Sequence, residues 1–316
     1  MTTIAVFGSI NMDLVAQVER FPAPGETVIA DGFNRFPGGK GANQAVAAAR
    51  LGGQVTMFGM VGAGPFGGEL LNSLKENRVQ VERVLRQDTS SGMAMILVNE
   101  SGENMIAITA GANGIVDRGY VESILPEIDK AKILLLQLEI PLEAIDALLQ
   151  RLPEGDPLVI LDPAPVQELS DLAALERVDI ITPNLGELEI LAEMDIIGEE
   201  RLKQAALRLV AEVGVRRIIC KAGMNGAYLM DEQGRFIHIP AFAVEAIDTT
   251  AAGDAFNGGL AVALTRGEKL EEALRYANAA GALAVTRVGA QPSLPTAAEV
   301  RRLLERSDHE EGWHTE

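Results

Sequence analysis

One short segment carries the residue types that phosphate chemistry needs. Residues 248–259 read Asp-Thr-Thr-Ala-Ala-Gly-Asp-Ala-Phe-Asn-Gly-Gly. The small residues Ala251, Ala252 and Gly253 stand where a strand is predicted to turn into a helix, so they would leave backbone N–H groups uncovered. A helix start adds partial positive charge, and an anion can then approach the main chain closely. We therefore predict an anion hole at these three residues.

The carboxylate of Asp254 would lie in the first turn of the same helix, beside the bound anion. There it could take the proton of an attacking hydroxyl while the backbone amides stabilise charge on a phosphoryl group in transit. The alternative is an acidic helix cap, because aspartate is favoured in a first helical turn in any case. The pair Gly253-Asp254 is a weak signal alone, and the twelve-residue string is a much stronger one.

A second glycine-rich turn, Gly38-Gly39-Lys40, precedes another predicted helix. It is not a Walker A phosphate loop, because Lys40 is followed by Gly41 rather than by the Ser or Thr that holds magnesium. We interpret it as a turn where Gly39 permits close approach of a ligand, and where Lys40 and Asn43 present hydrogen-bond donors. The alternative is an ordinary helix start with an exposed lysine.

Polar residues also follow two predicted strands directly. Asn11 and Asp13 come after the first strand, and Glu139 ends the apolar run Ile133–Leu138. Ligands of α/β proteins bind at the carboxyl ends of the strands, and amide and carboxylate groups together suit vicinal hydroxyls. The alternative for Asn11 and Asp13 is turn formation, which both residue types favour.

The string Asn184-Leu-Gly-Glu187 follows the predicted strand Val178–Ile181. Its spacing of three puts the amide of Asn184 and the carboxylate of Glu187 on one face of a helical turn. Such a pair could hold the hydration shell of a magnesium ion beside phosphates. The alternative is a capping box, with asparagine as the N-cap and glutamate at the third helical position.

These residues need a scaffold, and the pattern predicts a parallel sheet with helices on both faces. Short apolar runs alternate with helical patterns throughout the chain. The predicted strands are Ile4–Phe7, Val55–Val61, Ile133–Leu138, Leu158–Leu161, Val178–Ile181 and Arg216–Lys221, and the main predicted helices are Gly41–Leu51, Pro65–Asn77, Pro141–Leu152, Glu199–Val213, Gly253–Thr265 and Leu270–Thr286.

Two segments, Asp13–Phe36 and Met93–Thr109, break this alternation with apolar and polar residues in turn. Gly102-Glu-Asn104 lies between two apolar runs of the second segment and is typical of a hairpin. We predict a small β-sheet lid from residues 13–36 and 91–109, beside one α/β domain formed by residues 1–12, 37–90 and 110–316. The alternative is an extension of the main sheet at its edge.

Composition excludes several classes of partner. The chain has 316 residues and a formal charge of −18, which repels nucleic acids and anionic membranes. Aromatic residues make up only 4%, so platforms for stacking nucleic acid bases are not expected. The single cysteine, Cys220, lies in an apolar run and suits a reducing compartment. We expect a cytoplasmic protein that binds neither nucleic acid nor membrane.

Taken together, the motifs resemble those of the ribokinase-like (phosphofructokinase-B type) carbohydrate kinases, in their expected order from about residue 4 to about residue 305. The matching strings are Gly8–Asp13, Pro22–Thr27, Gly38–Ala45, Ala110–Asn113, Gln137–Glu139, Asp162–Pro165, Thr182–Glu187, Asp248–Gly258 and Val285–Ser293. The resemblance implies a mostly parallel central sheet flanked by helices, a small β-sheet lid, and ATP-dependent phosphorylation of D-ribose at its 5-hydroxyl.

The resemblance also implies a role for each matching residue. The sugar would be bound by Asn11, Asp13, Gly39, Lys40, Asn43 and Glu139, with Asp254 as the catalytic base and Ala251, Ala252 and Gly253 as the anion hole. ATP would be bound by Asn184, Lys221, Gly223, Gly226, Gly253 and Asn278. Mg²⁺ would be held indirectly by Glu187, and an activating K⁺ by Asp248, Thr250, Ala284, Arg287, Gly289 and Ser293. The lid would pair with that of a second subunit in a homodimer.

Three places depart from the family pattern. The turn Gly62–Gly67 lacks the aspartate that many members carry, which concerns local structure more than chemistry. Lys221 stands where members often carry threonine, and Asn278 stands where some carry histidine, so both nucleotide contacts are open. The alternative substrates are another small sugar, such as 2-deoxyribose or fructose, and a nucleoside. A protein that senses a sugar or nucleotide without catalysis is a further alternative, against which the presence of Asp254 argues, because sensing does not need a base.

Overall fold

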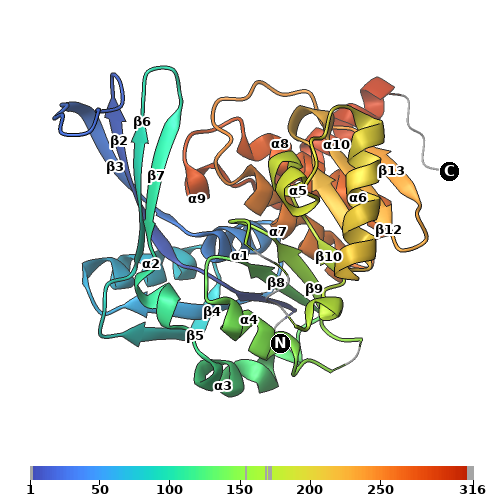
Figure 1. Cartoon of the computed structure of the whole chain (residues 1–316), viewed down its shortest axis with the longest axis horizontal. Helices are drawn as coiled ribbons and strands as arrows, with labels where there is room; N and C mark the ends of the chain where they lie inside the picture. The colour runs from blue at the N-terminus through green and yellow to red at the C-terminus, as the bar shows by residue number, and fades with distance from the viewer. Residues whose placement is uncertain (1–2, 154, 168, 170–172, 312–316) are drawn as a thin grey trace.

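A nine-stranded sheet forms the centre of the molecule (Figure 1). The computed structural model describes residues 3–153, 155–167, 169 and 173–311. The strand order is β13-β12-β11-β10-β9-β8-β1-β4-β5, and the pairs from β5 to β11 are parallel. The bounds are β1 Ile4–Phe7, β4 Val55–Gly62, β5 Gln80–Gln87, β8 Ile133–Gln137, β9 Leu158–Asp162, β10 Ile180–Ile181, β11 Arg217–Lys221, β12 Ala227–Asp231 and β13 Phe236–Ile239.

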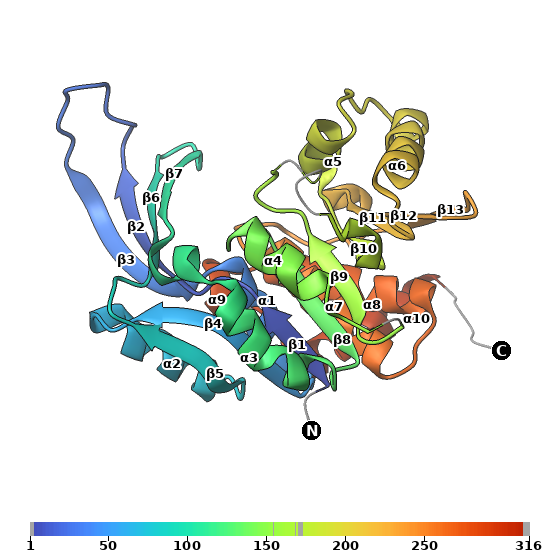
Figure 2. The ribbon, with the colours of Figure 1, turned by 60° about the horizontal axis from the view of Figure 1, so that its bottom comes forward.

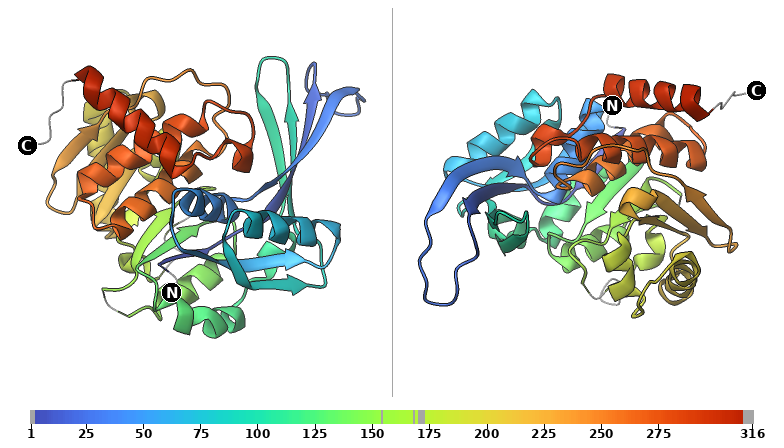
Figure 3. Two further views of the ribbon diagram at one scale, coloured as in Figure 1. Left: turned by 180° about the vertical axis from the view of Figure 1, so that it is seen from behind. Right: turned by 90° about the horizontal axis from the view of Figure 1, so that it is seen from above.

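Helices cover both faces of this sheet (Figures 2 and 3). Side chains of β1 alternate between two apolar cores: Ile4 and Val6 join the core under α1, α7 and α8, while Ala5 and Phe7 join the core under α3, α4 and α6. The helices are α1 Lys40–Arg50, α2 Pro65–Glu76, α3 Arg118–Ile128, α4 Leu142–Leu149, α5 Leu185–Leu191, α6 Glu199–Val213, α7 Ala252–Thr265, α8 Leu270–Ala284, α9 Ala290–Ser293 and α10 Ala297–Glu311.

A second, four-stranded sheet projects from the body with the order β3-β2-β6-β7 (Figure 1). Its strands are β2 Asn11–Val18, β3 Ala30–Gly38, β6 Gly92–Val98 and β7 Asn104–Thr109. The predicted hairpin is confirmed, since β6 and β7 pair antiparallel around residues 99–103. Pairing between β2 and β6 is parallel, because the chain crosses the main sheet through α1, β4, α2 and β5 between them.

The predicted strand Val178–Ile181 is shorter in the structure, where β10 comprises Ile180 and Ile181 alone. The N–H of Val178 donates to the carbonyl of Leu175 and so closes a turn in place of extending the strand. Within the described ranges, no helix combines the length and the apolar character that a membrane crossing requires.

Candidate active site

The predicted base, Asp254, lies in the first turn of α7, and its side chain is buried. One carboxylate oxygen accepts a hydrogen bond from the amide of Asn43 at 3.0 Å, and the other from the amide of Gln44 at 3.1 Å. The residue before α7, Ala251, holds a left-handed φ of 59°. The N–H of Ala252 donates to the carbonyl of Thr249 at 3.3 Å, and the N–H groups that follow in the first turn of α7 have no intrahelical partner, as at any helix start.

Glu139 lies directly after β8 and ties three chain segments together. Its Oε2 atom accepts hydrogen bonds from the hydroxyl of Ser9, from the backbone N–H of Lys40 at 3.1 Å, and from the amide of Asn11 at 3.5 Å. The carboxylate thus sits at the N-terminus of α1, where the helix dipole favours negative charge. Asn11 is itself oriented by Asn113, whose amide donates to its Oδ1 at 2.7 Å.

Close backbone packing brings α1 into the site. Gly39 has a φ of 87°, and a Cβ atom there would lie 2.7 Å from the backbone nitrogen of Asn11. A Cβ atom on Gly41 would lie 2.7 Å from the backbone nitrogen of Ser9. Only glycine permits these approaches, so the two glycines set the distance between α1 and the turn that follows β1.

Asp13 faces the same space from β2. Burial, together with the nearby carboxylates of Glu139 and Asp254, raises its pKa from the ordinary 3.8 to about 7. The pKa of Asp254 is raised to about 6, because burial and the charge of Asp162 outweigh the lowering by Lys40 and by the amides of Asn43 and Gln44. Both carboxyl groups therefore titrate close to neutral pH.

Lys40 supplies positive charge to this acidic cluster. Burial alone would lower its pKa, but the carboxylates of Asp162, Asp254 and Glu139 outweigh burial and raise it. The ammonium group therefore stays charged. The structure thus brings together Asn11, Asp13, Gly39, Lys40, Asn43, Glu139 and Asp254, which is the full set that the sequence predicted for the sugar.

Replacing Asp13 by asparagine is expected to stabilise the fold at pH 8. The folded pKa of about 7 lies above the ordinary 3.8, so the stability that protonated Asp13 contributes is present below about pH 4 and is lost as pH rises through 7. We expect Asp13→Asn to raise the free energy of unfolding by about 2 kcal/mol at pH 8 and to leave it unchanged at pH 4. Urea unfolding at both pH values measures this, and a variant less stable than wild type at pH 8 would contradict it.

The predicted nucleotide side lies at the carboxyl ends of β10 and β11. Asn184 and Glu187 form a capping box, in which each side chain accepts the other's backbone N–H at 2.8 Å. The capping box that the sequence offered as the alternative to a magnesium site is therefore present. It occupies only one oxygen of Glu187, whose half-buried carboxylate keeps an oxygen with no partner among the described residues, so a magnesium hydration shell fits there.

The loop after β11 has the shape of a tight turn. Gly223 and Gly226 have φ values of 56° and 83°, and a Cβ atom on Gly226 would lie 2.1 Å from the carbonyl of Ile239. The amide of Asn278 donates to the carbonyls of Ile239 and Pro240 at 3.0 and 3.1 Å. Asn278 therefore ties the end of β13 to α8, and its donor group is already engaged.

Asp248 joins two of the loops that were predicted to hold K⁺. Its carboxylate accepts hydrogen bonds from the backbone N–H of Thr250 at 2.9 Å and of Gly289 at 2.8 Å. Burial alone would raise its pKa, but these hydrogen bonds lower it, so Asp248 stays ionised. An ionised carboxylate with nearby backbone carbonyls is an oxygen donor set that suits a hard cation. Ala284, Arg287 and Ser293 lie in the same stretch of chain around Gly289.

Two residues that sequence reasoning did not assign complete the site. The amide of Gln44 donates to Asp254 and also to Asp162 at 3.0 Å, so one side chain bridges two carboxylates. Asp162 ends β9 in the same way that Glu139 follows β8. Ligands gather at the carboxyl ends of parallel strands, and this rule could have identified Asp162. Gln44 directly follows Asn43 in the sequence, and this adjacency could have identified Gln44.

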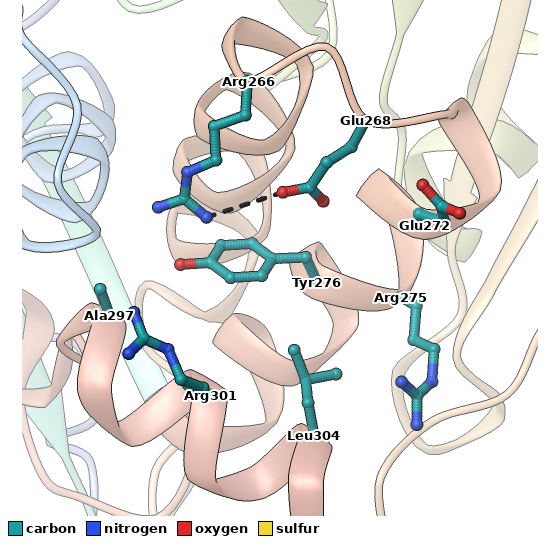
Figure 4. Close-up of a pocket in the computed structure, with 8 residues that line it drawn as sticks. All are labelled: Arg266, Glu268, Glu272, Arg275, Tyr276, Ala297, Arg301 and Leu304. Atoms are coloured by element: carbon teal, nitrogen blue, oxygen red, sulfur yellow. Dashed lines mark ion pairs between the residues drawn. The ribbon is translucent and has the colours of Figure 1, made fainter. Parts of the chain in front are cut away.

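A cavity of about 390 Å³ lies elsewhere, at the C-terminal end of α7 between α8 and α10 (Figure 4). Tyr276 lies at its centre with the guanidinium groups of Arg266 and Arg301 on either side. None of the residues predicted for the site lines this cavity. We therefore place the candidate active site at the other end of α7, where the polar residues converge.

The converging groups suit the transfer of a phosphoryl group to a hydroxyl. The buried Oδ1 atom of Asn43 has no hydrogen-bond partner among the described residues, and a hydroxyl of a ligand would satisfy it. Asp254 lies between this acceptor and the start of α7. A base for the hydroxyl and backbone donors for the phosphoryl group are therefore adjacent.

Comparison with known proteins gives the same reading. A family model described as pfkB family carbohydrate kinase matches residues 1–297. A ribokinase from Bacillus subtilis is 40% identical over 305 residues, covering 96% of this chain and 100% of that protein. A deoxyribokinase from Salmonella typhimurium is 36% identical over 304 residues, covering 95% of this chain and 98% of that protein.

A solved structure shares the fold over nearly the whole chain. The ribokinase of Arabidopsis thaliana, solved in complex with ribose and ATP, superposes with a TM-score of 0.88 at 32% identity. The match covers 96% of this chain and 99% of that one.

Proposed function

Because this chain belongs to the pfkB family of carbohydrate kinases, we propose that it phosphorylates D-ribose at the 5-hydroxyl with ATP, giving D-ribose 5-phosphate and ADP. The observation that carries the proposal is the position of Asp254, between a set of sugar-binding side chains and the N-terminus of α7. The relatives named for ribose and the complex with ribose and ATP support the choice of substrates.

The reaction follows from the geometry. Asn11, Asp13, Asn43 and Glu139 bind the sugar hydroxyls, and Lys40 balances the charge of the surrounding carboxylates. Asp254 accepts the proton of the 5-hydroxyl as its oxygen attacks the terminal phosphorus of ATP. The backbone of the anion hole at Ala251, Ala252 and Gly253 stabilises the charge of the phosphoryl group in transit.

We propose two cations as cofactors. Glu187 would hold Mg²⁺ through its hydration shell, and Mg²⁺ when bound neutralises charge on the ATP phosphates. Asp248, with carbonyl groups of the loops it joins, would hold K⁺. A cation there would hold the loop that contains Asp248 and Thr250 in place. This loop leads directly into α7, which begins at Ala252.

Turnover on a panel of acceptors tests the function. ADP release should be fastest with D-ribose, slower with 2-deoxyribose and fructose, and at background with nucleosides. The deoxyribokinase relative makes 2-deoxyribose the strongest rival. Added K⁺ should raise the rate at fixed Mg²⁺ if Asp248 holds a cation. Background rates with every acceptor would favour a binding protein without catalysis, and faster turnover of another sugar would replace ribose in the proposal.

We also propose that the small sheet acts as a lid and pairs with a second copy of the chain. Every residue of β7 is exposed, including Ile106 and Ile108 at 54% each. An apolar edge strand left in water is prone to pairing. We expect Ile106→Asp to convert a dimer to a monomer in sedimentation velocity, with Glu103→Gln in the turn beside it as the control. A wild-type monomer at micromolar concentration would rule out this assembly.

One observation supports a cytoplasmic location. Cys220 is a free, buried thiol, as expected of a protein in a reducing compartment.

A further inference from the structure

A second lysine lies at the anion hole, and it reaches there from a different strand. Lys221 ends β11, and its ammonium nitrogen lies 2.9 Å from a carboxylate oxygen of Asp162 at the end of β9. Asp162 is 2% exposed and the Lys221 side chain 13% exposed. A Cβ atom built on Gly253 would lie 3.2 Å from the same ammonium nitrogen. The ammonium group is therefore in contact distance of the first turn of α7.

This placement is unfavourable for a protein that only needs to fold. Burying an ion pair costs about as much in lost hydration as the attraction returns, so such pairs rarely add stability. A helix N-terminus also carries partial positive charge, which repels a second positive group. Asp162 offsets this repulsion when the site is empty. An anion between Lys221 and α7 would be attracted by both, which points to a ligand rather than to stability.

We propose that the ammonium group of Lys221 binds the phosphoryl group that is transferred, as a catalytic residue of the reaction proposed above, on which this inference rests. Asp162 keeps the lysine side chain extended toward Gly253. The amide of Gln44 holds the other oxygen of Asp162 at 3.0 Å and also holds Asp254. Lys221, which binds the phosphoryl group during its transfer, and Asp254, which deprotonates the sugar hydroxyl, therefore belong to one hydrogen-bonded chain through Asp162 and Gln44.

The transfer step balances with these groups in place. The bond between the sugar oxygen and the terminal phosphorus forms as the bond from that phosphorus to the bridging oxygen breaks. The electron pair of the broken bond stays on the β-phosphate of ADP, and the proton of the sugar hydroxyl moves to Asp254. The ammonium group of Lys221 takes no part in the proton transfer and stabilises the equatorial oxygens, over which the transition state spreads its charge.

Lys221→Met tests the proposal, because methionine keeps the length of the side chain and removes its charge. We expect kcat with ATP to fall about 10- to 100-fold, the effect of losing one charge-assisted hydrogen bond. The imido analogue of ATP, which keeps the terminal phosphoryl group, should bind more weakly, whereas ADP and ribose should bind as in wild type. Lys130→Met, at an exposed lysine in the turn after α3, is the matched control and should change none of these values.

The dependence of kcat on pH tells whether Lys221 acts as a charge at the anion hole or only as a structural partner of Asp162. Lys221→Met removes the ion-pair partner of Asp162, which keeps only the hydrogen bond from Gln44, and the charge of Asp162 already raises the pKa of Asp254. The acidic limb of the kcat profile should therefore move to higher pH. Asp162→Asn should move it to lower pH and should keep the affinity for the imido analogue. Similar losses of activity and melting temperature in both variants, without opposite pH shifts, would overturn the proposal.

Wild-type turnover of ribose, measured in parallel, keeps the two proposals apart. If wild type phosphorylates ribose and Lys221→Met does so at the same rate with unchanged affinity for the analogue, Lys221 has no part in catalysis. If wild type phosphorylates no acceptor, the kinase assignment itself fails. Circular dichroism of each variant confirms that the comparison concerns folded protein.

Discussion

Replacement of Asp254 by asparagine is expected to lower kcat by about 10²–10⁴-fold, the range found for a general base. Asparagine has the same shape, although its single oxygen can accept from only one of the two amides that donate to Asp254, and the backbone of α7 keeps its position. Ribose affinity should therefore change little. The wild-type rate should fall as the pH drops below about 6, the pKa that burial gives Asp254. The residual rate of the variant should not show this fall at acidic pH.

The same substitution should stabilise the folded protein at pH 8. The pKa of Asp254 lies above its ordinary 3.8, so the stability that the protonated group contributes is lost as pH rises through 6. Asparagine carries no charge and avoids the loss. Asp88→Asn, at an exposed turn residue, serves as the control for both measurements. A variant with near-normal kcat would remove Asp254 from the mechanism.

Gly41→Ala is expected to lower both kcat and stability through one steric conflict. The added Cβ atom would lie 2.7 Å from the backbone of Gly8 and from that of Ser9, and backbone atoms cannot turn aside as a side chain can. Overpacking of this kind costs about 1–3 kcal/mol. The helix α1 must move outward, and it carries Lys40 and Asn43 with it. A displacement of about 1 Å at a reacting centre can cost about 100-fold in rate.

Gly68→Ala in α2 is the matched control for Gly41→Ala. A Cβ atom there meets only the guanidinium group of Arg86 at 3.8 Å, which is an ordinary contact. Alanine is the better helix former by about 1 kcal/mol, so this variant should gain stability and keep its activity. Differential scanning calorimetry and steady-state kinetics on both variants measure the contrast. Equal stability and equal kcat of the two variants would show that the backbone around Gly8 shifts at little cost and would contradict this prediction.

Short-range pattern was sufficient to predict the parallel sheet and its covering helices. Strands such as Ile133–Gln137 are apolar on both faces, and this signal is complete within a few residues. The length of β10 was predicted wrongly, because hydrogen bonds of the turn around Val178 compete with the strand. The parallel pairing of β2 with β6 joins distant segments of chain, and no local pattern encodes such a register.

In the site, too, residues marked by a local pattern could be predicted, and contacts between distant segments could not. Asp254 and Glu139 could be predicted because each stands at a strand end or helix start that the sequence marks. The bridge from Asp254 through Gln44 to Asp162 could not, because it depends on side chains from three separate elements meeting at 3.0–3.1 Å. The capping box of Asn184 and Glu187 shows the converse case. There a local pattern predicted the contact correctly and left its chemical role open.

The left-handed alanine before α7 has a consequence for how tightly ATP can bind. Ala251 adopts a φ of 59°, a conformation strained by about 1–2 kcal/mol for alanine and free of strain for glycine. Alanine has far fewer conformations in the unfolded chain than glycine has. The loop therefore loses its conformational entropy when the protein folds, and little is left to lose when the phosphates arrive. Glycine at this position would relax the folded loop and transfer part of that entropy loss to the binding of ATP.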